Sequence, residues 1–378
     1  MNIASSRDGR IAVPLSHIED ARAVLADCSR HNPDSGMPYP YFCPGVCPSG
    51  TGDYGNNWWS LDYALAAEGA MLYDARAGEE LILNLLAVQK PDGRVPLYSI
   101  DSFPADWTNI VRPIGSLPKF FEAAHMAACQ NPSLRKKAFD LISRNLAWWY
   151  NNRFDEKTGL FSAVFEETFI PNTVSDAGVY APMDTNVELY LGCRAAADLA
   201  PDENTAAAFR SRADAILCAV RAHCYDETDG FFYPFVIPRG ERYKVRMASG
   251  FLGYYLNDPA VTARLNAHLT DDAEFGWDTV PLTGVAKDDP LFTVTTGDYT
   301  GNPSWEGSVW MLINDAVIRA LRAADQNALA DQLTAKTLAA FGKNCAEFLD
   351  PFTGKGNGML RYAWTAGLFL HLAQEINP

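Results

Sequence analysis

A glutamate near the end of the chain, Glu347, has neighbours that suit the chemistry of sugar cleavage. Asp350 and Pro351 follow it and favour a turn, while Gly354 allows backbone conformations that residues with a Cβ resist. Trp364 lies a short distance further along the chain. We therefore predict that Glu347 ends a helix and that a stiff turn holds its carboxylate facing tryptophan rings.

Two further clusters combine tryptophans with carboxylates. One covers residues 56–62 and the other residues 304–310, and each lies at the predicted start of a helix. Tryptophan faces stack on the C–H faces of sugar rings, and carboxylates accept hydrogen bonds from sugar hydroxyls. The sugar-contacting residues predicted from the three clusters are Trp58, Trp59, Asp62, Trp305, Glu306, Trp310 and Trp364.

Apolar residues recur at helical spacing along the whole chain, whereas strand-like segments such as residues 231–237 and 291–296 are few and short. The predicted helices cover residues 17–29, 59–75, 77–90, 117–130, 134–152, 184–199, 203–223, 246–256, 258–269, 306–322, 325–347 and 362–375. The pattern therefore predicts an all-α protein.

The same kind of turn follows three of the long predicted helices. Residues 154–161, 225–232 and 349–354 each place an aspartate a few positions before a glycine. This repetition indicates helix pairs, and a chain of 378 residues accommodates six pairs of about sixty residues each. Six pairs that close on themselves form an (α/α)6 barrel. No linker interrupts the chain, so we predict one domain, residues 1–378.

Long loops alternate with short ones along the chain. The long loops are residues 32–58, 91–116, 159–183 and 271–305. A solenoid of helix pairs would have uniformly short loops, so the alternation favours the barrel. Long loops that gather at one end of a barrel would build a pocket.

Composition excludes several classes of partner. The formal net charge is −15, and phosphate binding needs clustered Lys and Arg, so we expect neither nucleic acid nor an anionic membrane. The sequence has no run of eighteen apolar residues, and residues 1–13 lack a basic and then apolar leader. We expect a cytoplasmic protein whose partner is a small carbohydrate.

The eight cysteines are scattered, and several fall within apolar helical patterns, which predicts free buried thiols. Cys43 and Cys47 form a close pair, but no second pair lies at the spacing of a zinc site. No metal constellation is visible in the sequence, and we expect no cofactor.

The order of these motifs resembles that of the six-hairpin glycosidases of glycoside hydrolase families 63 and 37, which include mannosylglycerate hydrolases, processing α-glucosidases and trehalases. Residues 59–62 are similar to the family's Trp-x-x-Asp sugar-binding motif. Residues 116–119, which end in Lys119, are similar to its Gln-Pro-Pro loop, and residues 183–189, which include Asp184, to its Val-Asp-Leu-Asn helix. We therefore also predict that Lys119, Asp184 and Arg246 contact the substrate. Residues 305–310 are similar to its Trp-Arg-Gly-Pro-Val-Trp segment.

The resemblance extends to the terminal motif and implies an activity. Residues 347–354 are similar to Glu-x-Tyr-x-Pro-x-Thr-Gly, whose glutamate is the family's general base. The resemblance thus implies an exo-acting, inverting glycosidase that cleaves an α-linked glucoside or a related small oligosaccharide. One carboxylic acid protonates the glycosidic oxygen, and an opposite carboxylate, here Glu347, activates water.

The general acid is where this chain departs from the family. The family's acid is the Asp of Glu-Ser-Gly-x-Asp-Asn-Ser-Pro, and alignment on the first glutamate places Ile170 there. Apolar neighbours of Glu166 and Glu167 would raise a carboxyl pKa by desolvation, which favours Glu167. The candidate acids are Glu167, Glu166, Asp176 and Asp184.

Glu306 stands where the resemblance implies an arginine. A carboxylate in place of a cation favours a neutral, hydroxyl-rich substrate over one with a carboxylated aglycone. Positive charge for such an aglycone would have to come from one of four basic residues on segments expected to face the pocket, Arg112, Lys119, Lys244 or Arg246.

Two alternative functions remain open. A sugar isomerase or epimerase on the same barrel would use paired histidines, but none of the six histidines lies in the aromatic clusters. A catalytically altered sugar-binding protein is the second alternative, since the family's acid is absent from its usual place.

Overall fold

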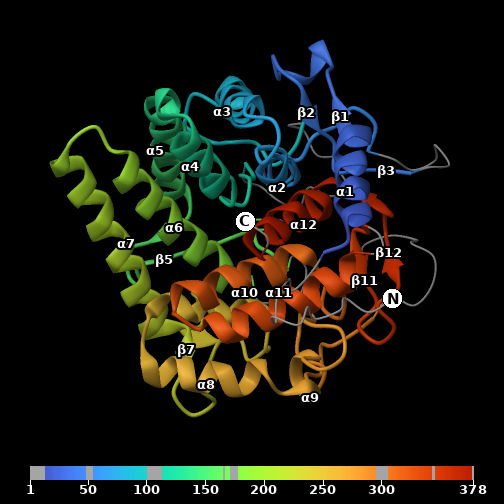
Figure 1. Ribbon diagram of the computed structural model, residues 1–378. Coiled ribbons are helices and arrows are strands. Elements are labelled where there is room, and N and C mark those ends of the chain that lie inside the picture. The colour runs from blue at the N-terminus through green and yellow to red at the C-terminus, as the bar shows by residue number, and fades with distance from the viewer. Residues whose placement is uncertain are drawn as a thin grey trace.

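The protein is described here by a computed structural model, which covers residues 13–47, 54–99, 113–164, 167–170, 178–294, 305–342 and 345–376. Helices dominate these ranges (Figure 1). The α-helices are α1 (Leu15–Cys28), α2 (Ser60–Ala70), α3 (Arg76–Val88), α4 (Phe120–Gln130), α5 (Arg135–Asn152), α6 (Met183–Leu199), α7 (Glu203–His223), α8 (Pro259–Leu269), α9 (Asp272–Phe275), α10 (Met311–Ala323), α11 (Asn327–Phe341) and α12 (Ala363–Ile376). The 3-10 helices are η1 (Pro33–Ser35), η3 (Pro132–Leu134) and η5 (Ala248–Leu256).

The strands are two residues long and form small antiparallel sheets in the described part of the chain. They are β1 (Ser29–Arg30), β2 (Tyr41–Phe42), β3 (Gly45–Val46), β4 (Phe154–Asp155), β5 (Leu160–Phe161), β6 (Tyr180–Ala181), β7 (Tyr225–Asp226), β8 (Phe231–Phe232), β9 (Phe235–Val236), β10 (Glu241–Arg242), β11 (Phe348–Leu349), β12 (Gly356–Asn357) and β13 (Arg361–Tyr362). The pairs are β1–β2, β3–β13, β4–β5, β6–β9, β7–β8, β9–β10 and β11–β12.

The predicted helices are confirmed as elements, with four corrections. The helix predicted for residues 59–75 ends at Ala70. Residues 248–256 form a 3-10 helix, α10 begins at Met311 so that Trp305 and Glu306 precede it, and α11 ends at Phe341. The prediction that Glu347 ends a helix is therefore wrong, because Glu347 directly precedes β11.

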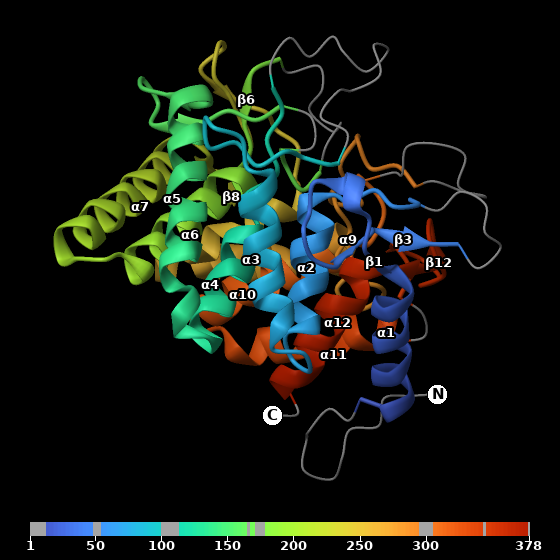
Figure 2. The same ribbon diagram turned by 90° about the horizontal axis from the view of Figure 1, so that it is seen from above.

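Six elements contact one another in a ring. Around the ring, α2 contacts α4, α4 contacts α6, α6 contacts η5, η5 contacts α10, α10 contacts α12, and α12 contacts α2. The other long helices pack outside it, with α1 on α12 and α2, α3 on α2 and α4, α5 on α4 and α6, α7 on α6, α8 on η5, and α11 on α10 and α12 (Figures 1 and 2). Outer and inner elements alternate along the chain.

Burial separates the two layers. In α10, consecutive residues from Met311 to Ile318 are all buried, because the outer helices cover one side and the other inner elements cover the rest. The outer helix α7 buries only an apolar stripe that includes Phe209, Ile216 and Val220. Inner helices α2 and α12 approach so closely that a Cβ on Gly69 would lie 2.4 Å from the carbonyl oxygen of Gly367.

The segments that precede the inner elements are joined to one another. Bridges link Trp59 to Tyr98 and Pro96 to Gly115, ahead of α2 and α4. Further round, β6 pairs with β9, and bridges join Met247 to Val285, Thr283 to Val309 and Val309 to Leu349, while β13 pairs with β3. The N-terminal ends of the inner elements thus gather at one end of the structure, where Figure 2 shows β6 and neighbouring loops above the helices.

The three repeated turns are β-hairpins, β4–β5, β7–β8 and β11–β12. In each, the aspartate side chain accepts hydrogen bonds from backbone N–H groups of the turn, such as those of Phe352 and Thr353 to Asp350. The glycines that end the turns, Gly159, Gly230 and Gly354, have φ of 73°, 70° and 66°. The predicted turn chemistry is confirmed.

The eight cysteines are thiols that form no disulfide bond in the described part of the chain, and five of them are buried, as predicted. None of the described helices has both the length and the apolar character needed to cross a lipid bilayer.

Candidate active site

The carboxyl of Glu347 is anchored by the backbone of the strand segment opposite it. The backbone N–H of Glu347 donates to the carbonyl of Met359 at 2.7 Å, and the N–H of Met359 donates to Oε2 of Glu347 at 3.0 Å. Burial raises the pKa of the Glu347 carboxyl to about 7, and the Met359 hydrogen bond opposes this rise. The carboxyl is therefore poised to exchange a proton near neutral pH.

A glycine makes room for this carboxylate. Gly358 has φ of +65°, and a Cβ at this position would lie 2.4 Å from Glu347 Oε2. Any other residue would meet both a strained backbone and a clash with the carboxylate.

Aromatic rings extend from Glu347 along the end of the structure where the N-terminal ends of the inner elements gather, which we call the loop end. The ring of Trp305 stacks on that of Trp310 with centroids 3.7 Å apart, and Trp310 lies 4.8 Å from Phe348, the neighbour of Glu347. Trp364 lies 6.0 Å from Trp310 and 5.0 Å from Tyr362. The structure thus brings together the tryptophans of the second and third clusters.

The first cluster joins the same group through Tyr362. Tyr54 contacts both Trp59, at 5.0 Å, and Tyr362, at 6.1 Å. The pKa of Tyr362 is raised chiefly by burial and further by the negative charges of Asp62 and Glu347. Trp59 is half-buried and also stacks on Tyr98 at 5.1 Å.

Trp58 lies in the core, as Trp310 and Trp364 also do, but its polar group is engaged by the protein. It is 2% exposed, and its indole N–H donates to the carbonyl of Ser35 at 3.0 Å. We therefore withdraw Trp58 from the predicted sugar-contacting residues.

Glu167, the favoured acid, is fully buried in an ion pair. Arg153 donates to its two oxygens from Nε and Nη2, each at 2.8 Å, and the N–H groups of Gly115 and Val164 donate to it at 2.8 and 3.0 Å. Burial raises the pKa of Glu167 and the Arg153 hydrogen bonds oppose the rise. All four contacts are donors, so they favour the carboxylate. This geometry argues against Glu167 as a proton donor.

Glu167 instead connects two segments of the loop end by hydrogen bonds. Gly115 precedes α4, and the hydroxyl of Thr185 on α6 donates to the carbonyl of Glu167 at 2.6 Å. The residue therefore joins the segments that lead into two neighbouring inner helices.

Asp184 has a similar positioning geometry. It is fully buried, and Thr168 donates its hydroxyl to the Asp184 carboxylate at 2.8 Å, while the N–H of Thr185 donates at 2.6 Å. Burial raises the pKa of Asp184, against the hydrogen bonds from Thr168 and Thr185. Asp184 thus holds residues 167–170 against α6, which does not fit the predicted acid or sugar-contacting role. The other candidate acids, Glu166 and Asp176, lie outside the described residues.

The predicted basic contacts are already engaged. Lys119 is 1% exposed, contacts Glu122, and lies 3.3 Å from Glu188 Oε1. Arg246 pairs with Glu274 at 2.9 Å and with Asp288 at 2.6 Å. These ion pairs leave neither residue a free charge for a carboxylated substrate. Arg112 lies outside the described residues.

Glu306 is half-buried next to Trp305, and its backbone carbonyl accepts a hydrogen bond from Val285 at 2.6 Å. Of the predicted residues, Glu347, Asp62, Trp59, Trp305, Glu306, Trp310 and Trp364 lie in connected segments of the loop end. Tyr362 and Arg153 were not predicted from the motifs. Tyr362 stands within an aromatic segment beside Trp364, whereas nothing near Arg153 in sequence points to Glu167.

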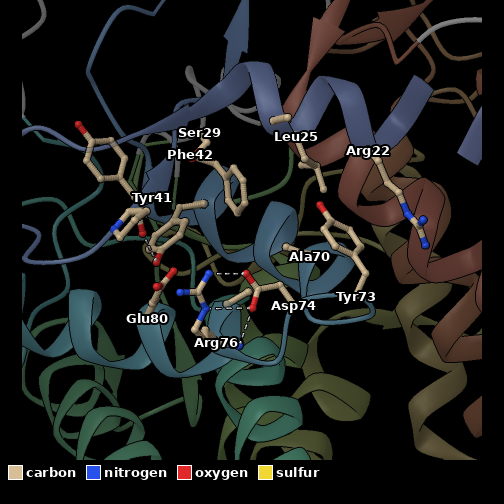
Figure 3. A pocket seen from close by; sticks show the side chains of 14 residues that line it. Arg22, Leu25, Ser29, Tyr41, Phe42, Ala70, Tyr73, Asp74, Arg76 and Glu80 are labelled. Carbon is tan, nitrogen blue, oxygen red and sulfur yellow. Dashed lines mark hydrogen bonds and ion pairs between the residues drawn. The ribbon is translucent and has the colours of Figure 1, made fainter. Parts of the chain in front are cut away.

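A separate cavity of about 350 Å³ lies between α1, α2 and α3 (Figure 3). Its walls include Tyr41, Phe42 and Tyr73, and an ion pair joins Arg76 to Asp74 within it. Those predicted site residues that the structure describes do not line this cavity.

Comparison with known proteins places the chain in a family. The model of the mannosylglycerate hydrolase MGH1-like glycoside hydrolase domain matches residues 166–365, more than half of the chain. The chain belongs to this family. The resemblance to six-hairpin glycosidases is thereby confirmed.

Individual relatives agree with the assignment. The chain is 30% identical over 149 residues to a mannosylglycerate hydrolase of Thermus thermophilus, covering 39% of this chain and 34% of that protein. It is 29% identical over 197 residues to the mannosylglycerate hydrolase of Rubrobacter radiotolerans, covering 48% and 42%. The matches thus span about a third to two fifths of these relatives' own length.

A solved structure agrees over nearly the whole chain. A family 63 mannosylglycerate hydrolase of Thermus thermophilus in complex with glucose has a TM-score of 0.74, covers 94% of this chain and 99% of its own, and is 22% identical. At this identity the comparison establishes the fold.

Proposed function

We propose that this chain hydrolyses the glycosidic bond of a small glycoside, with Glu347 as the general base. One observation carries the proposal: a buried carboxyl with a pKa near neutrality is fixed by the Met359 N–H beside a connected group of tryptophan and tyrosine rings. A base with such a pKa is deprotonated enough to activate water and basic enough to take its proton. Membership of a glycoside hydrolase family supports this reading.

The mechanism we propose is inversion at the anomeric carbon. Glu347 would take a proton from water, and a carboxylic acid on the opposite side of the sugar would protonate the leaving oxygen. Because Glu167 and Asp184 are held as positioning groups, we propose Glu166 or Asp176 as the acid. Glu167 would act by fixing the segment that follows Glu166.

The substrate class follows from charge. The relatives are named for mannosylglycerate, and glycerate carries a carboxylate. Of the four candidate cations, the three that the structure describes are engaged: Lys119 and Arg246 form ion pairs, and Lys244 pairs with Asp226 and Asp229. Glu306 adds a carboxyl group where the family has a cation. We propose a neutral substrate, such as an α-linked glucoside or a small oligosaccharide.

The frame we propose is a single (α/α)6 barrel. The ring of contacts from α2 through α4, α6, η5 and α10 to α12 supports it, as does the outer layer of alternate helices.

Hydrolysis is tested with a panel of α- and β-linked disaccharides and aryl glucosides, followed by ¹H NMR, which identifies the anomer released first. We expect the inverted anomer. Glu347→Gln should lower kcat by roughly 10²- to 10⁴-fold while sugar binding is kept, because a general base contributes about that factor.

Glu167→Gln is the matched control for this experiment. If Glu167 only positions a loop, its loss should slow the hydrolysis of substrates with good and poor leaving groups alike, whereas loss of the acid has little effect on substrates with good leaving groups.

A wild-type rate in Glu347→Gln removes Glu347 from the mechanism. Isomerised product would support the isomerase alternative, and binding without turnover the sugar-binding one.

A further inference from the structure

Three residues with metal-binding side chains meet far from the candidate active site. His125 and Cys129 are four residues apart on α4, and Asp198 lies on the adjacent helix α6. Their ligand atoms all lie within 4.8 Å of one another, and no other such group of His, Cys, Asp and Glu occurs among the described residues.

The spacing of these atoms suits a small tetrahedral ion. Nε2 of His125 lies 2.9 Å from Oδ2 of Asp198 and 3.7 Å from Sγ of Cys129. Zinc bonds to nitrogen, oxygen and thiolate sulfur place neighbouring ligand atoms about 3.3 to 3.6 Å apart. We propose that His125, Cys129 and Asp198 bind a zinc-like transition-metal ion, with water as the fourth ligand.

The surroundings favour a cation at this point. Cys129 is the next-to-last residue of α4, and Asp198 is the next-to-last residue of α6. The C-terminal ends of helices carry partial negative charge, and two of them converge here. Cys129 and Asp198 are exposed, so an ion and its water ligand can reach the site.

Among the described residues, Arg135 is the arginine with a hydrogen bond to Asp198. Its Nη2 donates to the backbone carbonyl of Asp198, and its Nη1 lies 3.8 Å from Oδ2, farther than Nε2 of His125. Arg135 can therefore keep its backbone bond, which fixes the end of α6, while Oδ2 turns to the ion.

The ligand set narrows the choice of metal. A thiolate, an imidazole and a carboxylate suit zinc and cobalt, whereas magnesium and calcium prefer oxygen ligands alone. Binding releases the thiol proton of Cys129. The imidazole proton moves to Nδ1, which frees Nε2 for the ion, so about one proton leaves for each ion bound.

The site would tie two neighbouring inner helices together at the end opposite the loops. Residues of the candidate active site precede the inner elements or begin them, whereas Cys129 and Asp198 are next to last in α4 and α6, and His125 lies about one turn before Cys129. The ion would therefore stabilise the frame, and the proposal does not depend on the glycosidase activity.

The test is titration of the chelator-treated full chain with Co²⁺. We expect one equivalent to bind with the absorption bands of a tetrahedral cobalt–thiolate site, and Zn²⁺ to displace it. Zn²⁺ should also protect Cys129 from a thiol reagent and raise the melting temperature. Cys129→Ser should abolish the thiolate band, and His125→Ala should weaken binding at least tenfold.

Cys218→Ser is the matched control, since Cys218 is an exposed free thiol on α7 and not part of the cluster. It should leave the cobalt spectrum unchanged. Asp198→Asn tests the site without altering α4 and should also weaken binding. The proposal is overturned if cobalt does not bind, if the thiolate band survives Cys129→Ser, or if Cys218→Ser removes it.

Discussion

The side chain of Glu347 shows how the backbone sets the chemistry of one carboxyl. Burial alone would keep it protonated, and the single N–H of Met359 offsets part of that effect. Glu167 lies at the other extreme, because a guanidinium and two amides hold it as a carboxylate. Two buried glutamates thus have different roles, which follow from the number of donors around each.

The pKa of Glu347 predicts a pH dependence of activity. As a base it works only when deprotonated, so kcat/KM should fall as pH drops below about 7. The measurement is a pH–rate profile from about pH 5 to about pH 9. Glu188→Gln should leave this acidic limb in place, because Glu188 lies in the central ion-pair network with Lys119. A limb that moves in Glu188→Gln would contradict the assignment to Glu347.

At the scale of elements, the β11–β12 hairpin and the segment that follows it hold the catalytic carboxylate. The turn is closed by Asp350, whose side chain accepts from the N–H groups of Phe352 and Thr353 at 3.0 and 2.7 Å. The chain then returns past Gly358, where the Glu347 carboxylate occupies the space a Cβ would need. Turn chemistry and carboxylate position are therefore linked.

Two glycine substitutions separate these effects. Gly358→Ala should displace the carboxylate and lower kcat tenfold or more, because its φ is +65° and its Cβ would lie 2.4 Å from Oε2. Gly354→Ala has nearly the same φ, +66°, but its closest neighbour would be 3.7 Å away. It should cost about 1 kcal/mol of stability and keep the activity. Measurements of kcat and of the unfolding free energy for both variants test this difference. Equal activity in the two variants would contradict this role of Gly358.

At the scale of the whole molecule, the inner elements enclose a network of charges. Lys119 on the α4 side and Arg319 on α10 face carboxyl groups from α2, α4, α6 and α10. These are Glu68, Glu122, Glu188 and Asp315. Two cations therefore face four carboxyls, and burial raises the pKa of Glu188 to about 8.

Because the buried carboxyl groups outnumber the cations, we predict that protonation of Glu188 makes the free energy of unfolding depend on pH. Its pKa in the folded state is about 8, above the ordinary 4.5, so its contribution is fully present below pH 4.5 and is lost as pH rises through 8. In Glu188→Gln the fall of unfolding free energy across this window should be smaller, by on the order of a few kcal/mol.

Urea unfolding at several pH values measures this slope. Loss of a partner for Lys119 shifts the level of the curve but not its pH dependence, so the slope is the test. Parallel curves for the two proteins would rule out Glu188 as the titrating group.

Local sequence determined the elements of this protein. Helical spacing of apolar residues located the elements of both layers, and an aspartate before a glycine located each hairpin, because both signals act over a few residues. It also singled out Glu347, since the turn that holds it is local. The end of α11 was placed too late, because apolar residues continue past Phe341 into β11.

Only the tertiary structure decided which side chains meet. Arg153 forms an ion pair with Glu167, and the carbonyl of Ser35 accepts a hydrogen bond from the Trp58 indole. Asp198 is hydrogen-bonded to His125, which is 73 residues away in the sequence. These contacts depend on which helices become neighbours in the ring, and that is set by packing of the whole chain. The position of the Glu347 carboxylate next to a tight turn could therefore be predicted from the sequence, whereas the side chains that surround the site could be identified only from the tertiary structure.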